Sequence, residues 1–454
     1  MATPADLTRP GPWAALFKSG RWLEKTTPDT PVERSGWAQV DPACETMVRY
    51  AASDVLDTAA LASALPAADP AVAERERAVQ RITARVTHRG LRVDADRVEH
   101  LITTHTQEQT AAAERVRAHG VDNPGSDQQL AAVLTGLGAG LPATATGRPS
   151  VAAPVLDGLK GSEGPVGDLV AAVLDYRHHE TVLKLFLRPY RQLCRRGDGR
   201  ARPTVYTLGA GTGRMSCTRP NLQQVPRQGG VRACITADPG QVLISADFSG
   251  VELRVAAALS GDESLATIIR DGRDLHMEIA RQVWGPEAGK RERYSAKRIV
   301  FGRLYGGGIP TLAKQGGVTE PVAASAVEVL DSLTPGLSAW SQRVRDHVRS
   351  GDTRFVTYSG RVIYLPLAFP HKAPNYCIQG SARELLVDAL LRWSDTPWGE
   401  STVLPVHDEI LAAVPEPDAQ HATDALVAVM RTELFGVPIT AEPSPLAPAW
   451  ADAA

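Results

Sequence analysis

The junction between an apolar run and an acid constrains this chain most: Val242-Leu243-Ile244-Ser245-Ala246 leads directly into Asp247. A short apolar run bounded by turn residues is typical of a buried strand. Apolar residues at helix-like spacing follow the acid, at Val251, Leu253, Val255 and Leu259. We therefore expect a strand whose end presents a carboxylate beside a backbone carbonyl and a second acid. Oxygen ligands of this kind are those that Mg²⁺ prefers.

A second acidic site, Val406-His407-Asp408-Glu409, lies far downstream between two apolar runs. Residues 403–414 fit a β-hairpin whose tip is His407-Asp408. Two distant carboxylates that share a pair of metal ions are typical of in-line phosphoryl transfer. An Asp at a hairpin tip is also common for turn geometry alone, and both interpretations stay open here.

A basic helix is predicted between the two acids. Arg293, Lys297, Phe301 and Tyr305 are spaced by four, and each such step turns a helix by about 40°, so all four cover one broad face. Cations at one end can hold a triphosphate, and an aromatic ring further along can stack on a base or sugar. Gly306-Gly307-Gly308 then ends the helix and could act as a hinge. A solvated basic helix with Phe301 in a core explains the same spacing.

An arginine and several side-chain amides precede the strand, in Thr212-Gly213-Arg214-Met215-Ser216 and Asn221-Leu222-Gln223-Gln224. Such residues can read sugar edges and minor-groove acceptors, although an ordinary polar loop is the simpler interpretation of them alone. Three other patterns indicate no site. The adjacent residues His178-His179-Glu180 do not converge on one metal ion, His276-Met277-Glu278 lacks the second His of a zincin helix, and Gly209-Ala210-Gly211 is too short for a dinucleotide fingerprint.

Length and composition exclude several classes of protein. The 454 residues allow roughly three domains, and no apolar run approaches the ~18 residues that a membrane helix needs. The N-terminus lacks the regions of a secretion signal. Five scattered cysteines match neither a zinc site nor a disulfide framework, which fits a protein of the reducing cytoplasm. A net charge of −2 argues against nucleic-acid binding driven by total charge but leaves local basic patches.

Helical and strand patterns divide the chain. Helices are predicted for residues 45–65, 73–87, 93–117, 168–190, 251–350 and 382–393, and capping-box spacing predicts a helix start at Ser126. Residues 66–72 indicate a linker and residues 136–167, rich in Gly and Pro, a flexible loop. Short strands are predicted within 201–247, around the turn Ser359-Gly360, and in the hairpin 403–414.

Five motifs, in this order, resemble those of family A DNA polymerases, the group of bacterial DNA polymerase I. Asp247–Arg254 resembles motif A, Arg293-x3-Lys297-x3-Phe301-x3-Tyr305-Gly306 resembles motif B, and Val406–Glu409 resembles motif C. Thr212–Arg214 with Pro220–Gln223 resembles the template-primer segment before motif A. Asn375-x3-Gln379-Gly380 resembles the segment before motif C. The resemblance covers about residues 75–454.

The resemblance implies an α+β fold shaped like a right hand, with an antiparallel palm sheet and mainly helical thumb and fingers. Residues 1–75 would be a remnant or edge of an exonuclease-like domain with a linker. Residues 76–200 would form the thumb, 201–259 and 360–454 the palm, and 260–359 the fingers.

The activity that the resemblance implies is template-directed DNA synthesis, in replication or repair. The resemblance also implies a protein of the bacterial cytoplasm, encoded by the host or a virus. The chain would bind primer-template DNA and extend the primer 5′→3′ with dNTPs, using two Mg²⁺ ions that Mn²⁺ can replace. Asp247, Asp408 and the Phe248 carbonyl would hold the ions ~3.5–4 Å apart, with Glu409 as a supporting acid. Lys297 would also be catalytic, by protonating pyrophosphate.

The resemblance also assigns the substrate contacts. Arg293, Lys297 and His276 would grip the triphosphate, and Phe301 would pack on the sugar and base. Tyr305 would lie near the templating base, and Glu252 would reject a 2′-hydroxyl. The primer-template duplex would be contacted by Arg214, Asn221, Gln223, Asn375, Gln379 and His407.

Two departures from the family pattern stand out. His371 occupies a position where many relatives have an Arg, which puts a DNA contact there in doubt. Tyr50-Ala51-Ala52-Ser53-Asp54 resembles the last motif of a 3′→5′ proofreading exonuclease, but upstream only isolated acids occur, at Glu24, Asp29, Glu33 and Asp41. We therefore expect no proofreading by the chain itself.

Alternatives remain open from the sequence. Residues 1–65 can be a remnant or an edge that docks a separately encoded exonuclease or another replisome protein, and Tyr50 and Asp54 can be a simple helix-surface pair. A catalytically silent DNA-binding protein on the same scaffold is the alternative from a different class.

Overall fold

The computed structural model describes residues 21–24, 32–35, 41, 43–65, 69–144, 146–227 and 229–450, and the chain divides into two compact units, residues 1–69 and 70–454. In the first unit, β1 (Arg21–Glu24) pairs antiparallel with β2 (Val32–Ser35), and α3 (Glu45–Ala64) follows. Cys44 Sγ caps α3 by accepting a hydrogen bond from the Met47 N–H at 3.4 Å. The helix predicted at 45–65 is confirmed. The linker predicted at 66–72 lies partly outside the described residues, and it is wrong at residues 70–72, which form the first turn of the helix Pro70–Arg89 with Pro70 at its start.

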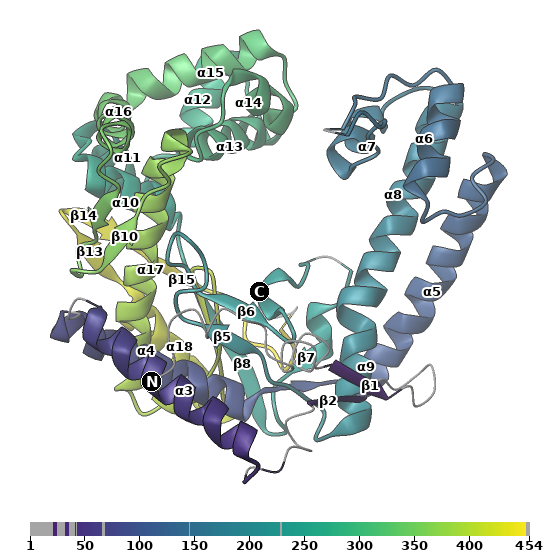
Figure 1. Ribbon diagram of the computed structural model, residues 1–454. Helices are drawn as coiled ribbons and strands as arrows, with labels where there is room; N and C mark the ends of the chain where they lie inside the picture. Colours follow the sequence, from purple (N-terminus) through teal and green to yellow (C-terminus); the bar gives the residue numbers. More distant parts are fainter. Residues whose placement is uncertain are drawn as a thin grey trace. The chain divides into compact units, whose positions relative to one another are not determined.

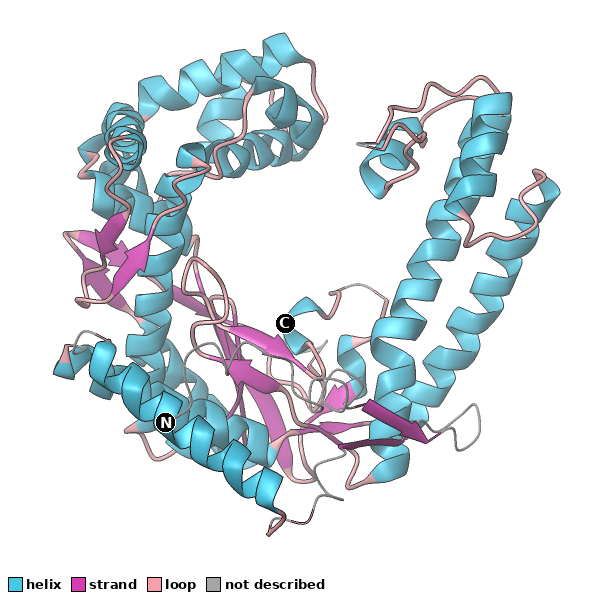
Figure 2. Cartoon of the chain, viewed as in Figure 1, coloured by secondary structure: helices cyan, strands magenta, loops and turns pink. Residues whose placement is uncertain are grey.

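A four-stranded antiparallel sheet is central to the second unit (Figure 2). Its strand order is β11 (Thr402–Val406), β12 (Glu409–Pro415), β8 (Gln241–Phe248) and β15 (Ala441–Pro443). Successive side chains of a strand point to opposite faces, so neighbouring residues of β8 enter two different cores. Leu243 joins the core that contains Leu411, whereas Ile244 joins the core that contains Ile410. Burial on both faces explains why β8 has a continuous apolar sequence, and the predicted strand and hairpin are confirmed.

Helices follow the sheet strand β8, as predicted for residues 251–350 (Figure 1, teal to green). They are α10 (Val251–Ser260), α11 (Glu263–Arg270), α12 (Leu275–Trp284), α13 (Lys290–Leu304), α14 (Ile309–Gly316), α15 (Glu320–Leu333) and α16 (Pro335–Arg349). Asp262 links two of them, because its Oδ1 accepts from the Leu265 N–H at 2.9 Å and its Oδ2 from the Leu337 N–H at 2.8 Å. A single buried carboxylate therefore caps α11 and holds the start of α16.

A second helical part precedes the sheet. It contains α4 (Pro70–Arg89), β3 (Leu91–Val93), α5 (Ala95–Ala118), α6 (Asp127–Gly136), α7 (Ala153–Leu159), α8 (Pro165–Val182), the π-helix η2 (Leu183–Leu187) and α9 (Arg188–Arg196). α5 and α8 lie side by side (Figure 1). The predicted start at Ser126 is confirmed, since its Oγ accepts from the Gln129 N–H at 3.3 Å. The loop predicted at 136–167 is wrong in part, because it contains α7, where Pro154 is tolerated in the first turn and Leu156 is fully buried.

Short elements complete the unit: β4 (Arg200–Ala201), β5 (Thr204–Tyr206), β6 (Ser216–Thr218), η3 (Leu222–Gln224), η4 (Arg232–Cys234), β7 (Ile235–Thr236), β9 (Arg354–Val356), β10 (Val362–Tyr364), η5 (Pro370–Lys372), α17 (Ala373–Ser394), η6 (Gly399–Ser401), η7 (Glu416–Asp418), α18 (Ala419–Met430), β13 (Thr432–Leu434) and β14 (Val437–Ile439). β9 and β10 pair around Ser359-Gly360 as predicted. α17 begins earlier than the predicted start at 382, since Pro374 stands in its first turn and Gly380 does not break it.

The described helices include none with the length and apolar character to cross a membrane. The predicted boundary at residue 75 falls inside α4. The limits of thumb, palm and fingers stay predictions.

Candidate active site

The two predicted acids, Asp247 and Asp408, lie on adjoining parts of the central sheet. Asp247 stands opposite Glu409 in the antiparallel ladder of β8 and β12, and the Phe248 N–H donates to the Asp408 carbonyl oxygen at 3.2 Å. His407 has a φ of 57°, and the chain reverses between β11 and β12 within His407-Asp408. Side chains 161 positions apart in sequence thus reach the same end of the sheet.

Glu409 is buried, and Asp247 and Asp408 beside it are half-buried. Burial raises the pKa of Asp247 to about 7, together with the nearby charges of Asp408 and Glu409. Burial also raises the pKa of Glu409. Within the described residues, Asp247 Oδ1 and Glu409 Oε1 are buried and accept no hydrogen bond. Because buried charge is costly unless it is compensated, this group of oxygens suits a cation.

The donor set fits a hard divalent cation that binds together with a phosphate substrate. Within the described ranges, there is no group of three or more His, Cys, Asp or Glu side chains that could hold a metal ion. Asp247, Asp408 and the Phe248 carbonyl offer oxygen atoms alone. Mg²⁺ is usually bound in this way, by one or two carboxylates with water and substrate phosphates in the remaining positions.

Glu252 is the meeting point of three segments that are distant in sequence. It lies in the first turn of α10 and is buried. Arg214 Nη2 donates to Glu252 Oε1 at 2.6 Å, and the Tyr305 hydroxyl lies 3.1 and 2.9 Å from its two oxygens. Burial and Glu252 raise the pKa of Tyr305 to about 12, so its hydroxyl stays protonated and donates. Gln379 of α17 also hydrogen-bonds Tyr305.

One face of α13 carries the residues predicted to bind the nucleotide. Lys297 Nζ lies 5.9 Å from the centroid of the Phe301 ring. The centroid of the His276 ring, which belongs to the neighbouring helix α12, also lies 5.9 Å from the Phe301 centroid. Arg293 Nε donates to Asp274 Oδ2 at 2.5 Å. Burial lowers the pKa of His276 to about 4, so this imidazole is neutral at pH 7. This face of α13 therefore has cations towards the start of the helix and aromatic rings towards its end.

Comparison with known proteins agrees with this geometry. A family model described as DNA polymerase family A matches residues 95–452. The chain belongs to DNA polymerase family A. The predicted family is thus confirmed, and with it the enzyme class, a DNA-directed DNA polymerase.

Similar polymerases come from a bacteriophage and from bacteria. The DNA polymerase of Mycobacterium phage D29 is 29% identical over 90% of this chain and 68% of its own length. The thermostable DNA polymerase I of Thermus filiformis is 30% identical over 81% of this chain and 47% of its own length. This family A polymerase thus spans about two thirds of the first relative and about half of the second.

A solved structure supports the predicted right-hand fold. The POL domain of Pol1 from M. smegmatis, in complex with DNA primer-template and dNTP, has a TM-score of 0.74 and 28% identity. The similarity covers 83% of this polymerase and 70% of that chain. The predicted α+β fold with an antiparallel sheet is therefore confirmed.

The other predicted DNA contacts of the polymerase differ in their surroundings. His407 is exposed at its hairpin tip. Among the described residues, Asn221 Oδ1 and Asn375 Oδ1 are buried without a hydrogen-bond partner. Gln223 is buried, and its amide nitrogen donates to the Pro405 carbonyl of strand β11 at 3.2 Å. This nitrogen therefore already has a hydrogen-bond partner within the protein.

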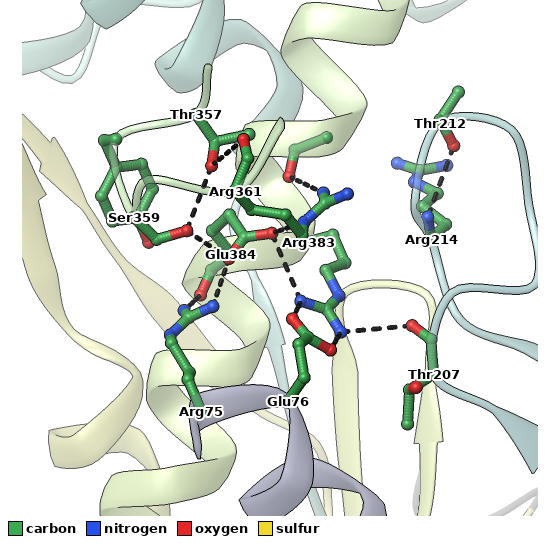
Figure 3. A network of polar contacts seen from close by, with 12 residues as sticks. Arg75, Glu76, Thr207, Thr212, Arg214, Thr357, Ser359, Arg361, Arg383 and Glu384 are labelled. Atoms are coloured by element: carbon green, nitrogen blue, oxygen red, sulfur yellow. Dashed lines mark hydrogen bonds and ion pairs between the residues drawn. The ribbon is translucent and has the colours of Figure 1, made fainter. Parts of the chain in front are cut away.

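A buried ionic network lies beside the turn at 212–214, which it meets at Arg361 (Figure 3). Its centre is Glu384, which is fully buried and accepts from Arg361 Nε at 2.6 Å, from Ser359 Oγ at 2.6 Å, and from Arg75 of α4. Burial acts to raise the pKa of Glu384, but Arg383, Arg361 and Arg75 outweigh it and hold this pKa below its usual value. The network therefore links α4, α17 and the β9–β10 turn through one ionised carboxylate.

The sequence motifs missed Arg361, Glu384 and Arg227. Arg361 and Glu384 belong to no pattern at short range, and only their burial in the fold reveals them. Arg227 is exposed, and its charge acts to lower the pKa of both Asp247 and Glu409, which places a cation near the acids. Nothing in its spacing separates Arg227 from an ordinary solvated arginine.

The exonuclease-like residues lie in the first unit. A hydrogen bond to Asp54 raises the pKa of Tyr50, so these two residues form a pair one turn apart on α3. Glu24 and Glu33 belong to β1 and β2, Asp41 precedes α3, and Asp29 lies outside the described residues. Their part in any nuclease-like surface stays a prediction.

Proposed function

We propose that this polymerase extends a DNA primer 5′→3′ on a template, with dNTPs, at the site of Asp247 and Asp408. One observation carries the proposal: these two acids adjoin at a strand end, and a buried oxygen of Asp247 has no hydrogen-bond partner within the described residues. The relative from M. smegmatis was solved with DNA primer-template and dNTP, which supports the same ligands here.

Asp247, Asp408 and the Phe248 carbonyl would hold two Mg²⁺ ions, which Mn²⁺ can replace. When bound, such a pair lowers the pKa of the primer 3′-hydroxyl and neutralises the triphosphate and the departing pyrophosphate. Glu409, opposite Asp247 in the ladder, would support the acids without binding the ions directly. The bond between the primer oxygen and the α-phosphorus then forms as the bond to pyrophosphate breaks.

The start of α13 would receive the triphosphate. Arg293 and Lys297 supply charge, and Asp274 orients the Arg293 guanidinium through the bond at 2.5 Å. His276, neutral at pH 7, would donate a hydrogen bond to a phosphate oxygen. Lys297 would give a proton to pyrophosphate as it leaves. Phe301 would pack against the sugar and base, which positions the α-phosphorus.

Selection of the sugar would depend on Glu252. Its carboxylate is held by Arg214 and Tyr305, so it cannot easily swing away from a bulkier sugar. A 2′-hydroxyl would meet this fixed group. Tyr305, at the end of α13, would also lie near the templating base.

The primer-template duplex would lie against a set of mainly neutral polar side chains. Amides and arginine suit the acceptors of the minor groove, which differ little between base pairs. The proposed contacts are Arg214, Asn221, Gln223, Asn375, Gln379 and His407.

Primer extension with Asp408→Asn tests the metal role. Loss of a ligand removes several kcal/mol of transition-state stabilisation, so extension should fall on the order of a thousandfold or more. DNA binding, measured by fluorescence anisotropy, should stay within about twofold. Asp418→Asn, which changes an exposed acid in the same region, is the matched control. Wild-type-like extension by Asp408→Asn would reject the site.

Three predictions need separate tests. The chain is expected to lack proofreading, which is tested by removal of a mismatched primer end with and without a candidate exonuclease. A silent DNA-binding protein would bind primer-template without any Mg²⁺-dependent extension. The cytoplasmic location stays a prediction; the similar polymerases come from a bacteriophage and from bacteria.

A further inference from the structure

The turn that follows Asp247 is held by hydrogen bonds from two sides. The Phe248 N–H donates to the Asp408 carbonyl oxygen at 3.2 Å, and the Ser249 N–H donates to the Thr440 carbonyl oxygen at 2.9 Å. Asp408 lies on the β12 side of strand β8, whereas Thr440 directly precedes β15 on the other side. The backbone after Asp247 is therefore fixed between its two neighbours in the sheet.

These bonds set the direction of the Phe248 carbonyl. This carbonyl shares a planar peptide unit with the Ser249 N–H, and in a trans peptide the two groups point in opposite directions. The N–H points to Thr440, so the carbonyl points to the side of β12, where Asp408 lies. A backbone oxygen is thus presented on the same side of β8 as Asp408, as the proposed metal site requires.

Arg254 of α10 ties this turn to strand β14. Its Nε donates to the Ser249 carbonyl oxygen at 2.7 Å, and its Nη1 donates to the Pro438 carbonyl oxygen at 2.6 Å. Pro438 is in β14, against which α10 packs, two residues before Thr440. The planar guanidinium of arginine presents several N–H groups at fixed angles, whereas lysine offers one ammonium group on a flexible stem. One side chain therefore joins the turn to the segment that accepts from the Ser249 N–H.

The charge of Arg254 does not explain this arrangement. Arg254 is half-buried, and burial lowers its pKa while the charge of Glu442 opposes the shift. Both of its hydrogen-bond acceptors are backbone carbonyl oxygens. A cation beside a metal site repels the metal ion, so the charge alone would weaken the binding of Mg²⁺. What Arg254 supplies to the site is the position of the backbone.

We propose that Arg254 is a positioning residue for the metal site. It holds the turn at Ser249 so that the Phe248 carbonyl and the Asp247 carboxylate keep the geometry that a divalent cation needs. Mg²⁺ demands near-ideal octahedral geometry, so a carbonyl that is turned away from its place is a poorer ligand. This inference rests on the proposed polymerase function and adds to it the residue that aims the backbone ligand.

Binding of Mn²⁺ without catalysis tests the inference. The polymerase is held in a complex with a dideoxy-terminated primer, its template and the next dNTP, and the EPR signal of free Mn²⁺ gives the Kd. Arg254→Met keeps an unbranched stem but removes both donors, and it should weaken Mn²⁺ binding roughly 10–100-fold, as is typical for loss of a group that orients a metal ligand. Arg254→Lys keeps the charge without the planar fork, and its Kd should lie between the two. Charge alone predicts the opposite sign, because loss of a cation would tighten Mn²⁺ binding.

Arg392→Met is the matched control. Arg392 is also a helical arginine whose Nε donates to a backbone carbonyl, that of Val429 at 2.8 Å, but this bond joins α17 to α18. The control should bind Mn²⁺ as the wild type does. Extension of an ordinary primer gives a second readout. In Arg254→Met the Mg²⁺ concentration for half-maximal kcat should rise by about tenfold or more, while KM for dNTP at saturating Mg²⁺ should stay within about twofold. A loss of stability alone would move neither value below the melting temperature of the variant.

Unchanged or tighter Mn²⁺ binding by Arg254→Met would overturn the inference. Full recovery by Arg254→Lys would overturn it as well, because a charge without the fork would then suffice. If Arg254→Met does not fold, Arg254→Lys decides, and a Kd equal to that of the wild type rejects the positioning role. A wild type that neither binds Mn²⁺ nor extends a primer rejects the proposed function, whereas a competent wild type beside an equally competent Arg254→Met rejects this inference alone.

Discussion

The Cα of Gly213 rests against the guanidinium of Arg361, and a Cβ at position 213 would stand 2.6 Å from both Nη1 and Nη2. Gly213 also has a φ of 85°, which other residues rarely adopt. The glycine therefore sets how closely the turn at 212–214 approaches the network of Figure 3. Arg214 follows Gly213 directly, so the same contact helps to position Arg214, whose guanidinium donates a hydrogen bond to Glu252.

We predict that Gly213→Ala lowers kcat/KM for dNTPs and the discrimination against ribonucleotides, each by about tenfold, because a displaced Arg214 leaves Glu252 less firmly held. Gly240→Ala is the control. Gly240 has a φ of 79°, but its added methyl would meet no heavy atom within 4 Å. Both variants should share a backbone cost of about 1–2 kcal/mol, measured by denaturant unfolding. Equal catalysis by the two would show that contact with Arg361 has no part in the reaction.

Replacement of Glu252 should change the choice of sugar. Glu252→Ala opens space where the 2′-hydroxyl would lie and leaves the Tyr305 hydroxyl without its acceptor, so ribonucleotide use should rise by roughly 10–200-fold. Glu252→Gln keeps the volume and should keep most of the selection. Steady-state kinetics with dNTP and rNTP pairs measures both. If the alanine variant still rejects ribonucleotides as the wild type does, another group excludes the 2′-hydroxyl.

A hydroxyl added at Phe301 should ease the use of dideoxynucleotides. The ring lies 5.9 Å from both Lys297 Nζ and the His276 ring on the proposed nucleotide face, so the new group in Phe301→Tyr could replace the contact of the missing 3′-hydroxyl. One such hydrogen bond is worth about 1 kcal/mol, which predicts a gain of roughly fivefold in the ratio of dideoxynucleotide to dNTP incorporation. Chain-termination assays measure that ratio, and an unchanged value would place Phe301 elsewhere.

The sequence could predict the strands and helix faces that depend only on the pattern of neighbouring residues. Asp247 follows an apolar run that is buried on both faces, and that run marks its strand without any knowledge of the rest of the chain. The spacing of Arg293, Lys297 and Phe301 likewise predicts their shared face. That Asp408 adjoins Asp247 depends on the pairing of β8 with β12, which the motifs implied only through the family resemblance.

Contacts between distant charged residues could not be predicted in this way. Arg75 and Glu384 are 309 positions apart, and each lies in a helix whose charges suggest a solvated face. Only the packing of α4 on α17 removes them from water. The Gly- and Pro-rich composition of residues 136–167 predicted a loop, and the helix α7 within this segment was therefore missed.

Removal of the charge of Glu384 should destabilise the protein strongly. Glu384→Gln leaves the buried arginines Arg361 and Arg383 without their shared carboxylate, while Ser359 and the fold around them stay in place. Loss of one partner from a buried ion pair costs about 3–5 kcal/mol. Thermal or denaturant unfolding at pH 7 measures this difference, and Asp395→Asn, an exposed acid at the end of the same helix, should change stability little.

The pH dependence of this difference separates charge from shape. The pKa of Glu384 is lower in the folded protein than in the unfolded chain, where it is about 4.3. Its ionisation therefore stabilises the fold fully above pH ~4.3, and this contribution is lost as the pH falls through the lower, folded pKa. The gap in unfolding free energy between wild type and Glu384→Gln should be constant near neutrality and shrink progressively below pH ~4.3. A gap that stays the same down to pH 3 would mean that the packing of this side chain, and not its charge, holds α4 on α17.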